Sequence, residues 1–347
     1  MEHPTRIFID TSKSVFQLHG VDAGERVVVR RRLQRSQVLA YFAKLEPTVV
    51  GLEACGGSHH WARALERLGH EVRLAPAQYV KAYLKRNKND GRDAEAGCEA
   101  MSRPTMRFVP VKSAERQAGQ MLAQVRQRLV RDRTRLSNEI RGYAAEFGLV
   151  SARGLDKLAP LLARIAADAG VPELARSLFA EMGEALAALE DQIERIERRL
   201  LAWHRQDEVS RRLAAIPGVG PIGAVMLTVK TVEPGLFRSG RDFAAWIGLT
   251  PKDHSTAGKQ RLGVITRAGD EDLRAVLVSG AMAVIQHARA GRSKPSPWLI
   301  ELLRRKQPKP AAVALANKTA RIAWKLMTSG QAYRAEPVGQ GPASAAA

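Results

Sequence analysis

The first hundred residues alternate between β-branched runs and amphipathic helical patterns, and this alternation constrains the fold more than any other feature. A turn, Asp22-Ala23-Gly24-Glu25, joins two of the runs and is typical of a β-hairpin. Helices are expected at 36–45, ended by Pro47, and at 58–68, ended by Gly69. The predicted strands are 6–10, 15–21, 27–33, 48–53 and 71–75. A three-stranded meander followed by helix, strand, helix and strand predicts an α/β domain with a mixed sheet.

Four carboxylates in this part of the chain could act together. Asp10 ends the first predicted strand and Glu53 ends the fourth, and in a mixed sheet these ends can be adjacent. Asp90 and Asp93 share one face if the segment 87–94 opens a helix. Converging negative charges repel unless divalent cations neutralise them, and such oxygen ligands suit Mg²⁺, two ions of which can flank a phosphodiester. The alternative is that the first two acids cap strand ends and the other two form a solvated helix start.

The middle of the chain is predicted to be helical, with two amphipathic stripes. The first runs from Leu122 to Phe147 with one break at Arg133, and arginines occupy its other faces. The second stripe has the alternating spacing of a coiled-coil seam. Its members are Met182, Leu186, Leu189, Ile193, Ile196, Leu200 and Trp203. We expect this seam to pack helices within or between subunits, and the glycines and prolines of 151–172 to interrupt the helices.

The last third opens with a glycine motif, Ile216-Pro217-Gly218-Val219-Gly220-Pro221. Closely spaced glycines between helices expose backbone N–H groups, which can hold a phosphate at a helix N-terminus. In this way Gly218 and Gly220 resemble the hairpin of a helix-hairpin-helix DNA-binding element. An ordinary Gly/Pro turn is the alternative.

The segment 248–263 is a predicted loop with two adjacent hydroxyl groups, those of Ser255 and Thr256. A serine near cations can act as a nucleophile toward phosphorus, because the charges stabilise both the alkoxide and the phosphorane. From the residue types alone, a hydroxyl that contacts phosphate is the interpretation we favour. The cations of this region are Lys252, Lys259, Arg261 and Arg267.

The charge of the chain indicates a polyanionic partner. Its 347 residues include 55 Lys and Arg against 35 Asp and Glu, a formal charge of +20. The positive charge runs along the whole chain, which favours nucleic acid over an anionic membrane surface. Two cysteines, Cys55 and Cys98, exclude a disulfide scaffold and a four-cysteine zinc site. Without an apolar run of membrane length or a signal core, we expect a soluble cytoplasmic protein with no membrane partner.

Together these segments resemble the DEDD transposases of insertion sequences. Residues 216–220, 248–251, 254–263 and 265–270 resemble that family's C-terminal transposase domain, and 321–326 fit its closing helix. The N-terminal resemblance lies in Ile9-Asp10, Gly51-Leu52-Glu53-Ala54 and Asn89-Asp90-Gly91-Arg92-Asp93-Ala94. The matching segments cover about residues 5–335 in the family's order.

The resemblance implies an N-terminal domain with the RNase H-like fold of the RuvC type. It implies that the catalytic serine, which links covalently to DNA, lies in the loop 254–258, where Ser255 is the expected residue. Ala257 stands where a glycine is common, and Thr256 leaves the register open by one residue. It also implies donor and target DNA and an element-encoded guide RNA as partners. The four acids expected to bind Mg²⁺ are Asp10, Glu53, Asp90 and Asp93.

We therefore expect a transposase, a site-specific recombinase that cleaves and rejoins the DNA of its own element and forms a dimer or tetramer through the coiled coil. The alternatives are a metal-dependent junction or hybrid nuclease that uses water, and a non-catalytic nucleic-acid-binding protein whose acids are structural. The expected parts are a RuvC-like domain (1–111), basic helices with the coiled coil (112–205), a mostly helical transposase domain (206–335) and a disordered tail (336–347).

Overall fold

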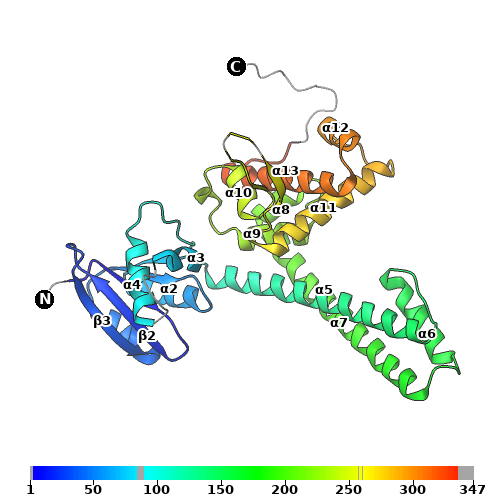
Figure 1. Cartoon of the computed structure of the whole chain (residues 1–347), viewed down its shortest axis with the longest axis horizontal. Helices are drawn as coiled ribbons and strands as arrows, with labels where there is room; N and C mark the ends of the chain where they lie inside the picture. The colour runs from blue at the N-terminus through cyan, green and yellow to red at the C-terminus, as the bar shows by residue number, and fades with distance from the viewer. Residues whose placement is uncertain (1–2, 84–89, 257, 260, 335–347) are drawn as a thin grey trace. The chain divides into compact units, whose positions relative to one another are not determined.

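The structure, a computed structural model, describes residues 3–83, 90–256, 258–259 and 261–334, with only the backbone for residues 90 and 91. Its contacts divide the chain into two compact units, Met1–Gln117 (unit 1) and Ala118–Ala347 (unit 2), which Figure 1 colours along the sequence. Within the described ranges, no helix is both long and apolar enough to span a membrane. The predicted tail, 336–347, lies outside the described residues.

Unit 1 is built on a five-stranded mixed sheet with the order β3-β2-β1-β4-β5. The strands are β1 (Arg6–Asp10), β2 (Val15–Val21), β3 (Val27–Gln34), β4 (Val49–Glu53) and β5 (Glu71–Ala75). The first three form an antiparallel meander, and β4 is parallel to both β1 and β5. The predicted strands and the mixed sheet are confirmed.

Helices cover both faces of this sheet. They are α1 (Val38–Phe42), α2 (Ser58–Glu66), α3 (Ala77–Val80) and α4 (Asp90–Met101), with 3₁₀ turns η1 (Arg35–Gln37) and η2 (Lys81–Tyr83). Alternation along β1 explains the two layers: Ile7 and Ile9 pack with α1 and α2, whereas Phe8 packs with α4. A Cβ on Gly97 of α4 would lie 2.2 Å from the Phe8 ring, so glycine is needed for this approach. The helix predicted at 36–45 begins as the 3₁₀ turn η1 and ends at Phe42, three residues earlier than expected.

Side chains of α2 hold the segment that leaves the sheet. His59 Nδ1 accepts the Lys112 backbone N–H at 3.2 Å. Arg63 Nη1 donates to the Lys112 carbonyl oxygen at 2.6 Å and to Gln117 Oε1 at 3.0 Å. Burial, aided by the charges of Lys112 and Arg63, lowers the pKa of His59 to about 4.

We expect the chain to lose stability as the pH falls from about 6.5 toward 4. The folded-state pKa of His59 lies below its unfolded value of about 6.5, so the unfolded chain binds this proton first and stability is lost across that window. For a half-buried group, the loss should be about 1–2 kcal/mol. Denaturant unfolding at several pH values measures it. His59→Gln keeps a hydrogen-bond acceptor that does not titrate, so it should flatten the dependence of unfolding free energy on pH. An unchanged pH dependence in this variant would show that His59 is not its cause.

The described part of unit 2 is mostly helical, as predicted, but a β-hairpin lies where the sequence predicted a loop at 248–263. Its helices are α5 (Ala114–Glu146, which begins in unit 1), α6 (Leu158–Ala167), α7 (Glu173–Gln206), α8 (Glu208–Ala214), α9 (Pro221–Lys230), α10 (Gly240–Trp246), α11 (Glu271–Arg289), α12 (Pro297–Arg305) and α13 (Pro308–Ser329). Two 3₁₀ turns are η3 (Leu155–Lys157) and η4 (Pro234–Leu236). The strands β6 (Pro251–Asp253) and β7 (Leu262–Ile265) form the antiparallel hairpin.

The arginine-rich stripe is one helix, α5, which continues through Arg133. The segment 151–172 interrupts the helices as expected, since α5 ends at Glu146 and α7 begins at Glu173, and it contains the short helix α6. Leu158, Leu161 and Ile165 of α6 are buried against α5 and α7, and this burial outweighs the helix-breaking glycines and prolines around them. The break between α5 and α7 is therefore confirmed, whereas the short helix within it was not predicted from the sequence.

The predicted seam of α7 packs within the chain. Leu186 lies in a buried cluster with Ile140 of α5 and Leu161 of α6. Leu200 shares the main core with Ala123 of α5, together with α9, α11 and α13. Since α5 and α7 contribute to that main core, the parts predicted as 112–205 and 206–335 belong to one unit. The core positions of the seam are occupied within the subunit, and assembly between subunits stays a prediction.

Candidate active site

Two of the predicted acids end neighbouring strands. β1 and β4 are paired in parallel with Ile9 opposite Leu52, so Asp10 and Glu53 come next on each strand. The loops beyond them also meet, because Thr11 Oγ1 and Cys55 Sγ are 3.4 Å apart. The adjacency expected from the mixed sheet is therefore present, and both acids are half-buried.

The helix α4 carries the other two acids in its first turn, as expected from the sequence. It runs antiparallel to β1, because Arg6 Nε donates to the Cys98 carbonyl oxygen at 3.1 Å while Gly97 lies against Phe8. Asp93 is one helical turn before Gly97 and is thereby shifted toward the end of β1 that carries Asp10. The side chain of Asp90 lies outside the described residues.

The predicted convergence of these acids on a metal is not seen. Among the side chains that the structure describes, no three Asp, Glu, His or Cys residues are close enough together to hold a metal ion. The described side chains of Asp10, Glu53 and Asp93 therefore do not form a three-ligand site in this structure. Their donor type and their position at one sheet edge nevertheless suit a hard divalent cation.

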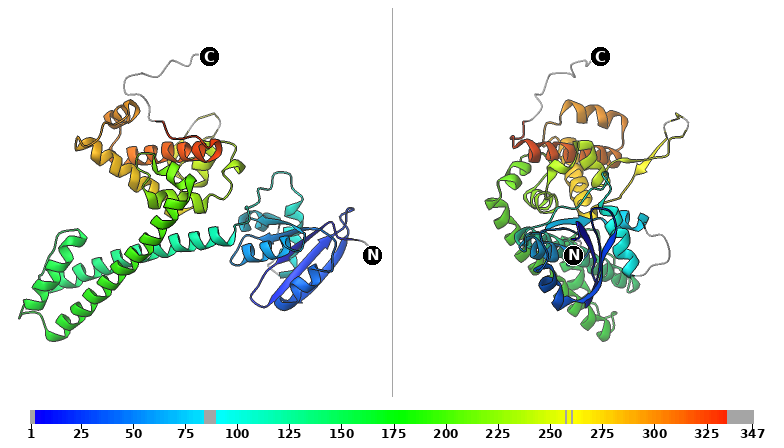
Figure 2. Two further views of the ribbon diagram at one scale, coloured as in Figure 1. Left: turned by 180° about the vertical axis from the view of Figure 1, so that it is seen from behind. Right: turned by 90° about the vertical axis from the view of Figure 1, so that its left-hand side faces the viewer.

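The predicted serine lies on the β6–β7 hairpin, which projects from the helices of unit 2 (Figure 2, right). Ser255 is exposed, and its Oγ accepts the Arg261 backbone N–H at 3.0 Å. Its own backbone N–H donates to Asp253 Oδ1 at 2.8 Å. The hydroxyl is therefore held between the two strands while one side faces solvent.

Asp253 is a residue that the sequence reasoning missed. Hydrogen bonds from the side chain and the backbone of Ser255 hold the pKa of the Asp253 carboxyl below its usual value. An aspartate two residues before a serine in a loop is a signal for this arrangement, because its carboxylate bonds the backbone two residues on.

The predicted cations surround this hairpin. Lys252, Lys259 and Arg261 are exposed, and Lys259 N–H closes the turn on the Thr256 carbonyl oxygen at 3.0 Å. Arg267, just beyond β7, has a φ of +55°, and the only other described non-glycine residue with positive φ is Glu25. That conformation is strained for an arginine and is held by its N–H bond to the Gly248 carbonyl oxygen at 3.2 Å.

The glycine motif lies between α8 and α9, and packing accounts for one of its glycines. Gly218 has a φ of +85°, and a Cβ there would lie 2.9 Å from the Gly280 carbonyl oxygen of α11. Gly220 precedes Pro221 at the start of α9 and has open space around it. The tight-turn alternative therefore explains Gly218, whereas a phosphate contact by either glycine stays a prediction.

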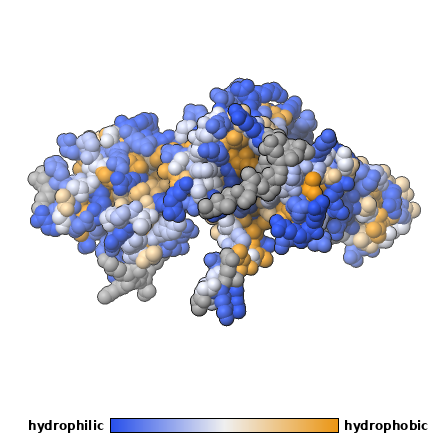
Figure 3. Space-filling model, turned by 90° about the horizontal axis from the view of Figure 1, so that it is seen from above, coloured by the Kyte–Doolittle hydropathy of each residue, from blue (hydrophilic) through white to orange (hydrophobic). Residues whose placement is uncertain are grey.

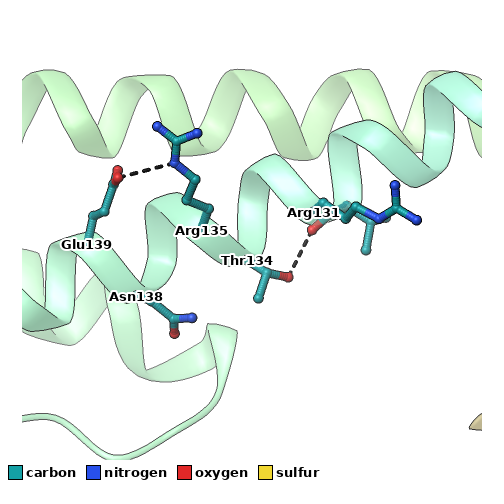
Figure 4. A pocket seen from close by; sticks show the side chains of 6 residues that line it. Arg131, Thr134, Arg135, Asn138 and Glu139 are labelled. Atoms are coloured by element: carbon teal, nitrogen blue, oxygen red, sulfur yellow. Dashed lines mark hydrogen bonds and ion pairs between the residues drawn. The ribbon is translucent and has the colours of Figure 1, made fainter. Parts of the chain in front are cut away.

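A further basic surface lies on α5. A shallow pocket of about 640 Å³ is lined by Arg131, Thr134, Arg135, Asn138 and Glu139 (Figure 4). Arg135 Nε is paired with Glu139 at 3.3 Å, and Thr134 Oγ1 donates to the Val130 carbonyl oxygen at 2.8 Å. Because these side chains already bond within α5, fewer of their polar groups are available for a ligand. The hairpin is therefore the stronger candidate site.

Comparison with known proteins identifies the family. The sequence model described as "Transposase IS116/IS110/IS902 family" matches residues 210–295, and one for DEDD transposases of the IS110 type matches 8–147. A Sinorhizobium fredii protein named as a transposase is 61% identical and covers 96% of this chain and 87% of its own length. The transposase for insertion sequence element IS1111A of Coxiella burnetii is 40% identical, over 94% and 90% of the two chains.

The chain belongs to the IS110/IS116 family of insertion-sequence transposases. The transposase is therefore an enzyme that cleaves and transfers DNA strands, which confirms the expected transposase activity and excludes a non-catalytic binder. The sheet of unit 1 belongs to the RNase H-like fold that the DEDD domain implies, and such domains generally use divalent metal ions. Neither comparison assigns a role to an individual residue.

In the transposase, a buried ionic network holds the start of α11, the helix that follows the β6–β7 hairpin. The Lys230 side chain is 3% exposed, and its Nζ lies 2.8 Å from Asp270 and 3.1 Å from Asp272. Asp270 also caps α11 through the Leu273 N–H at 2.9 Å. Asp272 pairs with Arg131 of α5 at 2.6 Å. The start of α11 is thus tied to both α9 and α5.

We expect Asp270→Ala to lower the free energy of unfolding by about 3–5 kcal/mol, because it strips a buried ammonium of its main partner and removes a helix cap. Denaturant unfolding monitored by circular dichroism measures this loss. Asp242→Ala is the matched control, since its partner Arg238 is 77% exposed and the change should cost at most about 1 kcal/mol. Equal losses of unfolding free energy for the two variants would show that the ion pair between Lys230 and Asp270 does not stabilise the fold.

Proposed function

We propose that this transposase cleaves DNA by direct attack of Ser255 on the scissile phosphate. The supporting observation is the placement of Ser255 on a projecting hairpin, where its backbone N–H donates to the Asp253 carboxylate and its exposed Oγ accepts the Arg261 backbone N–H. The Ser255 Oγ–phosphorus bond forms as the bond from phosphorus to the 3′ oxygen breaks, so the link to the 5′ phosphate keeps the bond energy for rejoining. A DNA adduct on Ser255 that survives denaturation tests the proposal.

The neighbouring groups have separate roles in this step. Asp253 orients the hydroxyl and is the group that we assign to receive its proton, while the leaving 3′ oxygen takes a proton from solvent. The Arg261 N–H stabilises the developing charge on Oγ. The phosphorane is stabilised by the surrounding cations Lys252, Lys259, Arg261 and Arg267.

We further propose that the carboxylates of unit 1 form a Mg²⁺ site. The proposal rests on Asp10 and Glu53 at the ends of paired strands and on Asp93 in the first turn of α4. Asp90 is the fourth ligand that the family resemblance implies. A bound divalent cation supplies the positive charge that allows these acids to approach one another and that polarises a phosphate oxygen.

The expected partners also remain proposals. A charge of +20 exceeds what contact with one short DNA duplex requires, which supports an additional RNA partner such as an element-encoded guide. Homo-oligomerisation would use the far end of the α5–α7 pair rather than the occupied seam. Exposed apolar side chains gather there: Tyr143, Phe147, Val150, Leu174 and Leu178.

A further inference from the structure

A large groove lies beside the base of the serine hairpin, inside unit 2. Its walls come from β6 and β7, from the start of α10, from α12 and from α13. Its volume is about 1410 Å³, above the range of about 300–1,000 Å³ that is usual for small-molecule pockets. The groove therefore suits an extended ligand better than a compact one.

The charges around the groove all have one sign. No Asp or Glu is found among the described residues that line it. Six basic side chains that line the groove have no ion-pair partner among the residues that the structure describes. They are Arg241, Arg267, Lys306, Lys309, Arg321 and Lys325. Such a rim is complementary to a polyanion and would repel a cationic or a basic peptide ligand.

The surface between these cations is apolar. Val264 of β7 is 69% exposed, which is unusual for a β-branched residue in a strand. Val313 and Ile322 of α13 are half-buried and line the same groove. At the α12 side, Lys318 Nζ lies 4.6 Å from the centroid of the Trp298 ring. Figure 3 shows apolar patches, in orange, among the mostly hydrophilic atoms of the face that is seen from above.

The groove and the hairpin that carries Ser255 share residues and a hydrogen bond. Asn317 Nδ2 of α13 donates to the Leu249 carbonyl oxygen, just before β6, at 3.2 Å. Arg267 ends the hairpin in a strained conformation and also lines the groove. From Pro251 to Ser255 the chain can extend by only about 13 Å, at about 3.3 Å per residue. A ligand in the groove therefore lies within a few nucleotides of the serine.

We propose that this groove binds an unpaired nucleic-acid strand, with its phosphates on the cationic rim and its bases on the apolar floor. The proposal deepens the proposed function and rests on it, because the strand is the one that continues to the Ser255 hairpin. An unpaired strand exposes base faces that can cover Val264 and Trp298, whereas a duplex hides them in its stack. Duplex DNA could place its phosphates on the cationic rim, but it would leave the apolar floor exposed to water.

Equilibrium binding tests the proposal on the full chain, by fluorescence anisotropy in EDTA so that no strand is cut. The probes are labelled oligothymidylate, labelled oligouridylate and a labelled DNA duplex of mixed sequence. The rim variant is Lys309→Ala with Arg321→Ala, matched by Arg198→Ala with Arg199→Ala, two exposed cations on α7. The floor variant is Val264→Asp, matched by Leu236→Asp, which is 53% exposed and does not line the groove.

We expect the rim variant to weaken binding of single strands at least about tenfold and to lower the slope of log affinity against log salt by about 1.4, or about 0.7 per lost phosphate contact. The floor variant should weaken single-strand binding at least about fivefold, because a charged carboxylate replaces the apolar side chain that the bases are expected to cover. Duplex binding should change less than about twofold in the floor variant, and the control variants should stay close to the parent.

Equal losses in groove and control variants would overturn the proposal, because the effect would then be general charge attraction. Equal losses for duplex and single strands would also overturn it, in favour of a duplex site. A larger effect on oligothymidylate or on oligouridylate supports the groove and identifies its strand as DNA or RNA. Ser255→Ala separates the two proposals, because it should leave binding of single strands to the groove intact. If the serine mechanism alone proved wrong, the groove proposal would still be judged by the binding of the groove variants.

Discussion

Replacing Ser255 by alanine is expected to abolish strand cleavage and the covalent protein–DNA adduct together, with at least about a thousandfold loss of rate. The reason is that the adduct and the cleavage come from one bond-forming step at Oγ, and no water-based route keeps the bond energy for rejoining. Wild-type reactions stalled after cleavage should carry DNA that survives denaturation. Mass spectrometry should place it on the peptide that contains Ser255 and Thr256.

Thr256→Ala is the matched control, because its hydroxyl lies one residue along the same exposed turn and points elsewhere. It should retain most of the activity. Asp253→Asn should be intermediate, since an amide can still orient the Ser255 N–H but is a poor proton acceptor. DNA found on Thr256 would move the nucleophile by one residue. Efficient cleavage by both alanine variants, without any adduct in the wild type, would instead indicate a nuclease that uses water.

The second large effect is expected at the sheet edge of unit 1. Asp10→Asn and Asp93→Asn should each abolish cleavage and weaken Mg²⁺ binding measured by calorimetry at least about tenfold. Nucleic-acid binding should persist or tighten, because each change removes a negative charge without touching the basic surfaces. Loss of nucleic-acid binding together with cleavage would indicate misfolding rather than a lost ligand.

Glu71→Gln provides the control for this metal site. Glu71 begins β5, at the opposite end of the sheet from the strand ends that carry Asp10 and Glu53, and it pairs with Arg73 at 2.7 Å. Its removal should leave Mg²⁺ affinity and cleavage unchanged. Unchanged Mg²⁺ affinity in Asp10→Asn and Asp93→Asn as well would mean that these acids are structural caps.

Local patterns in the sequence determined most of unit 1. β-branched runs with period two, a Gly-containing turn and helix stops at Pro47 and Gly69 were enough to predict the strands and a mixed sheet, since each depends on residues close together in the chain. The sequence made the adjacency of Asp10 and Glu53 possible, and the strand order seen in the structure decided it. The same local reasoning predicted the helical character of the rest and the break between α5 and α7, but it missed α6, where tertiary burial outweighed the residue preferences around it.

Only the tertiary structure decided what these elements contact. The α7 seam proved to pack on α5, α6 and α9 of the same chain, because an apolar stripe specifies burial and not the identity of its partner. Lys230 meets Asp270, and Lys318 meets Trp298, across separations that no periodicity encodes. The groove beside the serine hairpin arises from three separate stretches of sequence. Its shape depends on how helices pack, and packing is set by side-chain volumes summed over the whole core rather than by any local pattern.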